Sequence, residues 1–253
     1  MDLSLPGYPS TLTSRPQIAR ISTEGWTLRN FYCASCGAGL SSYPVGTPLY
    51  DFHSPTCKER FQLKASSRQF GRSVLDSEYH TALNGVLRDA YPSLILMRYD
   101  PARWAVSDLE LVHRACITTS CLVRRKPLGS GARRAGWEGC TISLASIPSL
   151  GRIGVVRNGV VRPKSAVLEQ WNRSNRLLET EPNARGWVAD VLVCVERLYS
   201  TFTLENVYSC EGELAAKHPR NHFVKAKIRQ QLQVLRELGI IEFISPGVYR
   251  RIR

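Results

Sequence analysis

Residues 50–64, with the sequence YDFHSPTCKERFQLK, contain the kinds of side chain that a hydrolytic metal site uses. The stretch is typical of two short strands joined by a turn, with Asp51 on the first strand and Gln62 and Lys64 on the second. Side chains alternate between the two faces of a strand, so Gln62 and Lys64 point the same way and Leu63 points the other way. If the strands pair, Asp51, Gln62 and Lys64 converge on one spot.

An acid, an amide oxygen and a lysine at one spot suit the hydrolysis of a phosphodiester with the help of Mg²⁺. Asp51 and the side-chain carbonyl of Gln62 supply the oxygen ligands that this cation prefers. Lys64 would position or deprotonate the attacking water and offset the developing negative charge. In the plainer interpretation Asp51 is a turn residue and Lys64 is a solvated edge residue, because Asp followed by Gln-x-Lys also arises by chance in basic proteins.

Cysteines before and inside the same stretch predict a second metal site. Cys33 and Cys36 form a Cys-x-x-Cys-Gly knuckle, which is half of a tetrahedral zinc site. We expect Cys57 as the third ligand and His53 as the fourth, because imidazole is a usual zinc ligand and the hydroxyl of Ser54 is a poor one. The alternative, a redox Cys-x-x-Cys, lacks a surrounding βαβ pattern. The zinc loop would clip a hairpin that is too small to close a core alone.

The charge of the chain favours a polyanionic partner. Its 253 residues include 34 Lys and Arg against 21 Asp and Glu, for a net charge of +13. Nucleic acid or an acidic membrane surface suits such an excess, although a basic protein without such a partner is the alternative. No apolar run approaches the roughly 18 residues that span a bilayer, and no secretory signal is evident. We therefore expect a cytoplasmic protein, with its eight cysteines as free thiols or metal ligands.

Hydrophobic spacing predicts the elements that position the candidate residues. After a short helix at 13–23 and the two strands, we expect a helix at 73–90 and strands at 93–99 and 108–113. A helix at 165–182 follows. The order strand, strand, helix, strand, strand is that of a compact α/β nuclease core, and many other α/β folds share it.

Residues 114–164 are the most basic segment, with ten Lys and Arg against one acid, Glu138. A Gly-rich loop with the flanking residues Arg124, Arg125, Arg133 and Arg134 suits contacts to phosphates. Trp137 at the tip of this loop would stack on a base or wedge into a groove. Alternatively, Trp137 caps the core and the arginines are solvated. We favour the DNA interpretation because so few acids balance the arginines.

A polar stretch at 179–183 marks a boundary, which divides the chain into domains of residues 1–181 and 182–253. In the second domain we expect helices at 186–199, 203–216 and 221–238 and a hairpin of strands at 240–244 and 248–252. Three helices and a hairpin make a winged helix-turn-helix. The outer face of the third helix carries residues that suit a major groove: His222, Lys225, Lys227, Arg229, Gln230 and Gln233. The basic face argues against the alternative of a winged helix for protein contacts.

Taken together, the sequence resembles the DpnI-type, methyl-directed restriction endonucleases over nearly its whole length. The resemblance lies in YCxxCG at 32–37, DF at 51–52 with LK at 63–64, RKPL at 125–128, ARRAGWxGC at 132–140, RGW at 185–187, KIRQQLQxLR at 227–236 and IIEF at 240–243. It implies an α/β (α+β) restriction-endonuclease-like core of the PD-(D/E)xK type with a zinc-binding insertion, followed by a winged helix. It also implies Mg²⁺-dependent cleavage of both strands of adenine-methylated G-A-T-C.

The resemblance assigns roles to single residues. It implies that Asp51, Gln62 and the backbone carbonyl of Leu63 bind Mg²⁺, and that Lys64 is the catalytic lysine. Trp137 falls at the family's DNA-wedging tryptophan. From the RGW stretch we expect DNA contacts by two further residues, Arg185 and Trp187.

Two positions depart from the family pattern. The type member has Glu where this chain has Gln62, which keeps a carbonyl oxygen and loses a charge, so Mg²⁺ should bind more weakly. Ser54 replaces a zinc cysteine. We assign the vacant ligand role to His53, although the family pattern does not itself support this choice.

These observations predict an endonuclease that cleaves double-stranded DNA at N6-adenine-methylated sites, with Mg²⁺ as the catalytic and Zn²⁺ as the structural cofactor. We expect a monomer in solution and no membrane association. The alternative is a weakened or inactive protein that binds methylated DNA without cutting it. Gln62 is the residue that motivates this alternative.

Overall fold

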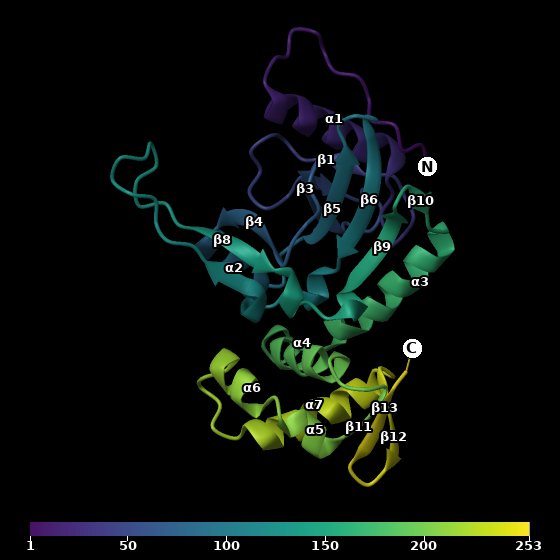
Figure 1. Ribbon diagram of the computed structural model, residues 1–253, viewed down its shortest axis with the longest axis vertical. Helices are drawn as coiled ribbons and strands as arrows, with labels where there is room; N and C mark the ends of the chain where they lie inside the picture. Colours follow the sequence, from purple (N-terminus) through teal and green to yellow (C-terminus); the bar gives the residue numbers. More distant parts are fainter. Residues whose placement is uncertain (253) are drawn as a thin grey trace.

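A seven-stranded sheet forms the centre of the N-terminal part of the protein in the computed structural model, which describes residues 1–252 (Figure 1). Its strands in spatial order are β1 (Ser41–Ser42), β2 (Phe52–His53), β3 (Arg60–Ser66), β5 (Ser93–Asp100), β6 (Ala105–Val112), β9 (Arg152–Arg157) and β10 (Val160–Val161). β3 and β5 are parallel, and every other neighbouring pair is antiparallel. The first five residues of β5 are buried, which explains its continuous apolar run.

Each face of this sheet is covered by different elements. On one face, α1 (Arg15–Asn30) and α3 (Lys164–Asn175) contribute Trp26 and Trp171 to a core with Ile95 and Met97 of β5. On the other face lie α2 (Tyr79–Leu87) and a second sheet with the order β4 (Ser73–Glu78), β8 (Gly139–Ser143) and β7 (Leu122–Arg124). Short 3₁₀ helices connect these elements at Arg114–Cys116, Thr119–Cys121, Leu144–Ser146, Ser149–Gly151 and Arg176–Glu179.

The helix predicted at 73–90 is wrong in its first part, because residues 73–78 form β4. Leu75, whose spacing fits the apolar face of the predicted helix, is 60% exposed. The helix begins only at Tyr79, because the Glu78 side chain accepts hydrogen bonds from the backbone N–H groups of His80 and Thr81 and so caps it. The strands predicted at 93–99 and 108–113 are confirmed, within β5 and β6 respectively.

The C-terminal part has the helices and the hairpin of a winged helix-turn-helix. It consists of α4 (Pro182–Glu196), β11 (Thr201–Thr203), α5 (Leu204–Tyr208), α6 (Glu211–Lys217), α7 (Val224–Glu237), β12 (Ile241–Ser245) and β13 (Val248–Arg251), with the strand order β11-β13-β12. The single helix predicted at 203–216 is thus two helices, α5 and α6. Thr203 caps the first of them, since Thr203 and Asn206 form a reciprocal capping box.

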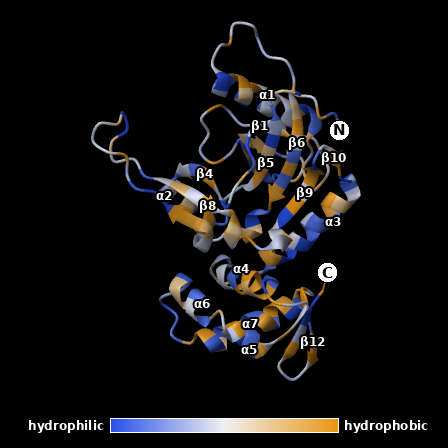
Figure 2. Ribbon diagram, in the orientation of Figure 1, coloured by the Kyte–Doolittle hydropathy of each residue, from blue (hydrophilic) through white to orange (hydrophobic). Residues whose placement is uncertain are grey.

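One apolar core joins the two parts of the protein. It runs from Leu94 and Leu96 of β5, through Trp187 and Leu192 of α4, to the helices and strands beyond α4. Hydrophobic colouring accordingly continues from the sheet into α4 (Figure 2). The mixed α/β core followed by a helix-turn-helix domain confirms the expected fold class. Among residues 1–252, none of the helices combines the length and the apolar character that crossing a membrane requires.

Candidate functional site

The β2–β3 hairpin places Asp51 beside the segment 62–64. The two strands pair as predicted, with buried Phe52 opposite buried Phe61. Asp51 immediately precedes this pair and Gln62 immediately follows it. The Asp51 carboxylate Oδ2 accepts a hydrogen bond of 2.7 Å from the backbone N–H of Leu63. Asp51 is therefore anchored to the backbone of the residue that lies between Gln62 and Lys64.

Asp51 also lines an open pocket of about 550 Å³ between α1 and β3. Leu63 lines the same pocket, and α1 contributes Arg20 and Glu24, whose side chains form an ion pair of 2.8 Å. Arg20 and Glu24 are not among the residues that we predicted near Asp51. Nothing in local spacing connects α1 to a strand that begins about thirty residues after its end, so only the tertiary fold reveals this contact.

The pKa of Asp51 is raised above its ordinary value. Burial of the carboxyl group is the main cause, and the negative charge of Glu24 adds to it. The hydrogen bond from Leu63 and the positive charges of Lys64 and Arg20 act in the opposite direction without cancelling the effect. A partly buried carboxylate that faces a second acid has a strong electrostatic reason to bind a cation.

Gln62 and Lys64 lie on the face of β3 opposite to the side chain of Leu63. The side-chain oxygen Oε1 of Gln62 is buried and has no hydrogen-bond partner among the described residues. Lys64 Nζ donates a 2.7 Å hydrogen bond to Asp76 Oδ1 on β4. Asp76 is not among the predicted site residues, because a helix at 73–90 gives it no relation to β3.

The pKa of Asp76 is lowered, although its side chain is 0% exposed. Burial alone would raise this pKa, and it is outweighed by the charge and hydrogen bond of Lys64 together with a hydrogen bond from Tyr91. Asp76 is therefore an ionised, buried carboxylate that faces Lys64.

Asp51 is joined to the backbone of Leu63, but the described residues show no direct hydrogen bond between the side chain of Asp51 and those of Gln62 and Lys64. The set fits a hard cation in two respects. Asp51 supplies a carboxylate next to the backbone of Leu63, and Gln62 supplies a buried carbonyl oxygen without a partner. Lys64 is close enough for its charge to lower the pKa of Asp51.

Three cysteine sulfurs form a cluster at the turn of this hairpin. The Sγ atoms of Cys33, Cys36 and Cys57 all lie within 4.8 Å of one another, and Cys33 and Cys57 are 3.5 Å apart. This spacing is compatible with thiolates around one ion. The three cysteines predicted as zinc ligands are thus brought together, and they could hold Zn²⁺.

The fourth residue at the cluster is Ser54, and our choice of His53 is corrected. Ser54 is fully buried, and its Oγ lies 3.3 Å from Cys36 Sγ. His53 is absent from the group of possible ligands among the described residues, and its ring packs against Tyr43 with centroids 4.8 Å apart. Neighbouring residues of an extended chain point in opposite directions, so a backbone that directs Ser54 inward directs His53 away.

Within the basic segment, residues 125–138 form a loop between β7 and β8 that extends away from the rest of the molecule (Figure 1). Arg125, Arg133 and Arg134 are exposed along it, as DNA contacts require. Arg124 is also exposed but is paired with Glu138.

Trp137 does not lie at the tip of this loop. Its ring packs against the backbone of Gly139 at the base, under the guanidinium of Arg134, 4.8 Å from the ring centroid. Its indole Nε1 is buried without a hydrogen-bond partner among the described residues. To wedge into a groove, Trp137 would have to leave this position.

The exposed face of α7 carries the basic residues that we predicted. Lys225 and Arg229 are exposed on the helix, and His222 is exposed just before it. Lys227 is partly buried and donates to Gln230 Oε1. The opposite face of α7 is buried through Val224, Ile228, Gln231, Leu232 and Leu235, as an amphipathic recognition helix requires.

Two residues predicted to contact DNA are instead buried inside the protein, and those predictions are corrected. Arg185 is 4% exposed and forms an ion pair of 2.9 Å with Asp89. Trp187 is 7% exposed and stacks on His218 with centroids 3.9 Å apart. Their residue types suited DNA, but on α4 Arg185 faces Asp89 of the N-terminal part and Trp187 packs against the end of α6.

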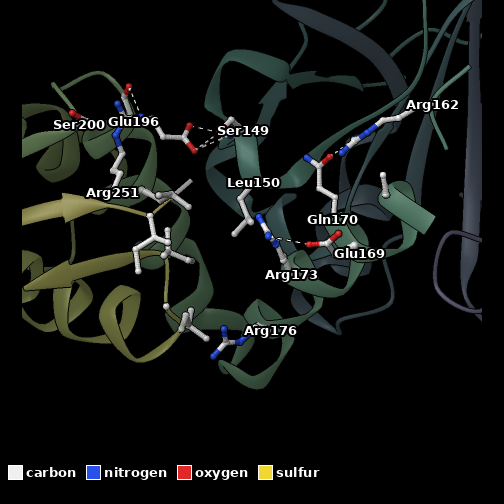
Figure 3. Close-up of a pocket in the computed structure, with 16 residues that line it drawn as sticks. Ser149, Leu150, Arg162, Glu169, Gln170, Arg173, Arg176, Glu196, Ser200 and Arg251 are labelled. Carbon is white, nitrogen blue, oxygen red and sulfur yellow. Dashed lines mark hydrogen bonds and ion pairs between the residues drawn. The ribbon is translucent and has the colours of Figure 1, made fainter. Parts of the chain in front are cut away.

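A further pocket, of about 760 Å³, lies elsewhere, between α3 and the C-terminal hairpin (Figure 3). Arg162 and Arg173 point into it and are engaged by Gln170 and Glu169. Glu196 reaches across to accept hydrogen bonds from Ser149. None of the predicted site residues lines this pocket, and the contact between Glu196 and Ser149 joins the two parts of the protein.

Comparison with protein families gives two matches that together cover almost the whole chain. Residues 8–180 match the family model DpnI, described as the Dam-replacing family. Residues 183–251 match the family model DpnI_C, described as the Dam-replacing HTH domain. The first match contains the β2–β3 hairpin with the cysteine cluster, and the second contains α7 and the C-terminal hairpin.

Proposed function

The chain belongs to the DpnI, or Dam-replacing, family, and from this premise we propose that it is a methyl-dependent restriction endonuclease that hydrolyses double-stranded DNA. The observation that carries the proposal is the hydrogen bond from Leu63 N–H to Asp51, which ties the acid to the Gln62-Leu63-Lys64 segment. A DNA-acting family with a helix-turn-helix domain makes DNA the partner. The net charge of +13 supports the same partner.

In this proposal the catalytic residues are Asp51, Gln62 and Lys64. Asp51, the side-chain oxygen of Gln62 and the backbone carbonyl of Leu63 would hold Mg²⁺, which supplies a Lewis acid for the phosphate when it is bound. Asp51 and Gln62 supply one negative charge between them. The ammonium of Lys64 orients the attacking water and offsets the charge that develops on the phosphate oxygens.

The proposed substrate is G-A-T-C with N6-methyladenine, and this choice rests on the family resemblance. Basic residues on two surfaces would hold the duplex: Arg124, Arg125, Arg133 and Arg134 on the β7–β8 loop and His222, Lys225, Lys227 and Arg229 on or beside α7. Contacts of these types to phosphates position the duplex, and contacts to base edges specify the sequence. We assign the two surfaces to the proposed domains of residues 1–181 and 182–253.

A second candidate function is a protein that binds methylated DNA without cutting it. Gln62 favours this candidate, because an amide in place of a carboxylate weakens a site for a divalent cation. The two candidates share their DNA contacts and differ only in hydrolysis.

Short duplexes that differ only in adenine methylation separate the two candidates. Binding is measured in Ca²⁺, and single-turnover cleavage is measured in Mg²⁺ and in Mn²⁺. The endonuclease proposal predicts cleavage of the methylated duplex and of no other. Tight, methyl-specific binding with no cleavage in either metal would support the binding protein instead, and equal cleavage of both duplexes would contradict methyl dependence.

We propose further that the cysteine cluster holds a structural Zn²⁺. Three sulfurs within 4.8 Å of one another support this assignment, with Ser54 beside them as the fourth group. Metal analysis of the purified protein should find about one Zn²⁺ per chain. A purified, folded protein without zinc would contradict the assignment.

A further inference from the structure

The catalytic lysine of the proposed function is held by a residue from a different sheet. Asp76 lies on β4, in the three-stranded sheet, whereas Lys64 lies on β3 of the seven-stranded sheet. The distance from Lys64 Nζ to Asp76 Oδ1 is 2.7 Å, with side-chain exposures of 16% and 0%. The amine of Lys64 therefore meets a carboxylate that water does not reach.

The other oxygen of Asp76 is also engaged. Tyr91 Oη donates a 2.6 Å hydrogen bond to Asp76 Oδ2, and Cys140 Sγ lies 3.8 Å from the same oxygen. Tyr91 is 3% exposed, and burial raises the pKa of its hydroxyl well above the ordinary value, which keeps it a donor. With each oxygen bound to a protein group, Asp76 has one fixed orientation and offers its Oδ1 to Lys64.

The energetics of burial make this contact a strong constraint on Lys64. A carboxylate removed from water is stabilised only by a close positive partner and satisfied hydrogen bonds. In the part of the chain that the structure describes, Lys64 is the only cation in ion-pair distance of Asp76. An unconstrained lysine side chain has many rotamers. Holding it in one of them before the reaction means that this conformational entropy is not lost in reaching the transition state.

Position 62 makes the constraint more important in this chain. Gln62 and Lys64 share a face of β3, but the amide of Gln62 has no charge with which to orient the ammonium. Among the described residues, Asp76 is the only acid in ion-pair distance of Lys64. Because Lys64 and Tyr91 engage both of its oxygens, Asp76 is arranged to orient the lysine rather than to bind a cation directly.

We propose that Asp76 is a positioning residue for Lys64, which rests on the proposed function of Lys64 in DNA cleavage. The carboxylate holds the ammonium in the place from which it acts on the water and the phosphate. Tyr91 fixes the carboxylate in turn. Asp76 thereby supplies, from β4, the negative neighbour that position 62 of this chain does not provide.

The test compares Asp76→Asn with wild type in three measurements: the affinity for methylated duplex in Ca²⁺, the single-turnover cleavage rate, and the Mg²⁺ concentration for half-maximal rate. The asparagine keeps the shape and the hydrogen bond from Tyr91 and removes the charge. We expect a loss in rate of about 10- to 100-fold, as for a misplaced catalytic group. The affinity and the Mg²⁺ dependence should change less than about twofold, a split that general destabilisation does not produce.

Asp190→Asn is the matched control. Asp190 is also a buried carboxylate, and it pairs with Lys217 at 3.1 Å, but it lies in the C-terminal part of the protein, on α4. We expect this variant to lose thermal stability and to cleave DNA at the wild-type rate well below its melting temperature. Should Asp76→Asn fail to fold, Tyr91→Phe tests the positioning role instead, because it removes only one hydrogen bond to Asp76. We expect this variant to cleave severalfold more slowly than the wild type, and an unchanged rate would contradict the positioning role.

The outcomes separate this inference from the function on which it rests. A wild-type protein that cuts no duplex refutes the proposed function, and the positioning role with it. A wild-type protein that cuts, together with a folded Asp76→Asn variant that cuts equally fast, refutes the positioning role alone. A large rise in the Mg²⁺ requirement of Asp76→Asn also overturns it, because that result would make Asp76 a cation ligand.

Discussion

At position 62 the proposed cation site has an amide oxygen that is buried and without a hydrogen-bond partner among the described residues. A buried polar atom without a partner carries a cost of roughly 1–3 kcal/mol, which a bound cation would relieve. The amide nevertheless brings no charge, so Asp51 is the only ionised ligand among the proposed set. This residue decides how well the protein binds Mg²⁺.

We predict that Gln62→Glu lowers the Mg²⁺ concentration needed for half-maximal cleavage by about tenfold, because a second carboxylate strengthens a site for a hard cation. A Mg²⁺ titration of the single-turnover rate measures this shift. Gln62→Ala is the control, and it should raise the requirement. An unchanged requirement in both variants would show that residue 62 does not bind the cation.

A second residue predicts the response of the whole protein to acid. His113 is fully buried, its Nε2 lies 3.0 Å from Asn175 Oδ1, and its Nδ1 accepts from the backbone N–H of Ala115. Burial is the main cause that lowers the pKa of His113 to about 3. In the unfolded chain the ordinary pKa is about 6.5. The folded state thus excludes a proton that the unfolded state binds.

The stability contribution of His113 is complete above about pH 6.5 and is lost as the pH falls toward 3. We predict a loss in the free energy of unfolding on the order of 1.4 kcal/mol for each pH unit below 6.5, until buried carboxylates add their own effect. Urea unfolding at several pH values measures this slope. In His113→Gln the slope of the unfolding free energy between about pH 6.5 and 5 should decrease by the amount that corresponds to one bound proton. An unchanged slope would contradict the prediction that His113 is neutral in the folded state.

At the scale of single elements, the β2–β3 hairpin carries two proposed metal sites that use opposite ends of one short structure. The cysteine cluster lies where the chain turns from β2 to β3, and Asp51 lies where β2 begins. β2 has only two residues and cannot fix its register alone. A metal at the turn would therefore stabilise the strand pairing that positions Asp51.

We predict that Ser54→Cys tightens zinc binding at least about tenfold, since a thiolate is a much better zinc ligand than a hydroxyl. Competition with a chromophoric chelator measures this change. His53→Ala is the matched control on the neighbouring residue and should bind zinc as the wild type does. A loss of zinc in His53→Ala would restore His53 as a ligand and contradict the geometry described above.

The elements also show what the sequence could predict and what it could not. Strong local patterns located β5, β6, α7 and the C-terminal hairpin, because apolar spacing and turn residues act within a few positions. β4 was mistaken for helix because Leu75 fits a helical spacing although it is exposed in a strand. That single error concealed Asp76. Glu24 and the burial of Arg185 depend on contacts between distant elements, which no local pattern encodes.

At the scale of the whole molecule, one continuous core joins the sheet of the N-terminal part to the C-terminal helices through α4. The ion pair between Arg185 and Asp89 closes this interface at its edge, where Asp89 also pairs with Arg114 at 3.0 Å. The two parts thus share one packed core and are not separate units joined only by a flexible linker.

We predict that the chain unfolds in one cooperative transition. We also predict that Arg185→Ala lowers its free energy of unfolding by about 1–3 kcal/mol. The loss is no larger because Asp89 keeps Arg114 as an ion-pair partner. Calorimetry measures both. Arg125→Ala is the contrasting control on an exposed arginine, and it should leave the free energy of unfolding unchanged. It should also reduce the slope of the logarithm of DNA affinity against the logarithm of salt concentration by about 1, as for the loss of one phosphate contact. Two separate transitions would contradict the common core.

The most direct test of the central claim uses one plasmid prepared with and without N6-methyladenine in G-A-T-C. Each form is incubated in Mg²⁺ with equal concentrations of wild type and of Lys64→Met, whose folding is checked by its melting curve. We expect the wild type to cut the methylated plasmid alone and the variant to cut neither. A wild type that leaves the methylated plasmid intact at high concentration, or a folded Lys64→Met that still cuts it, would contradict the account.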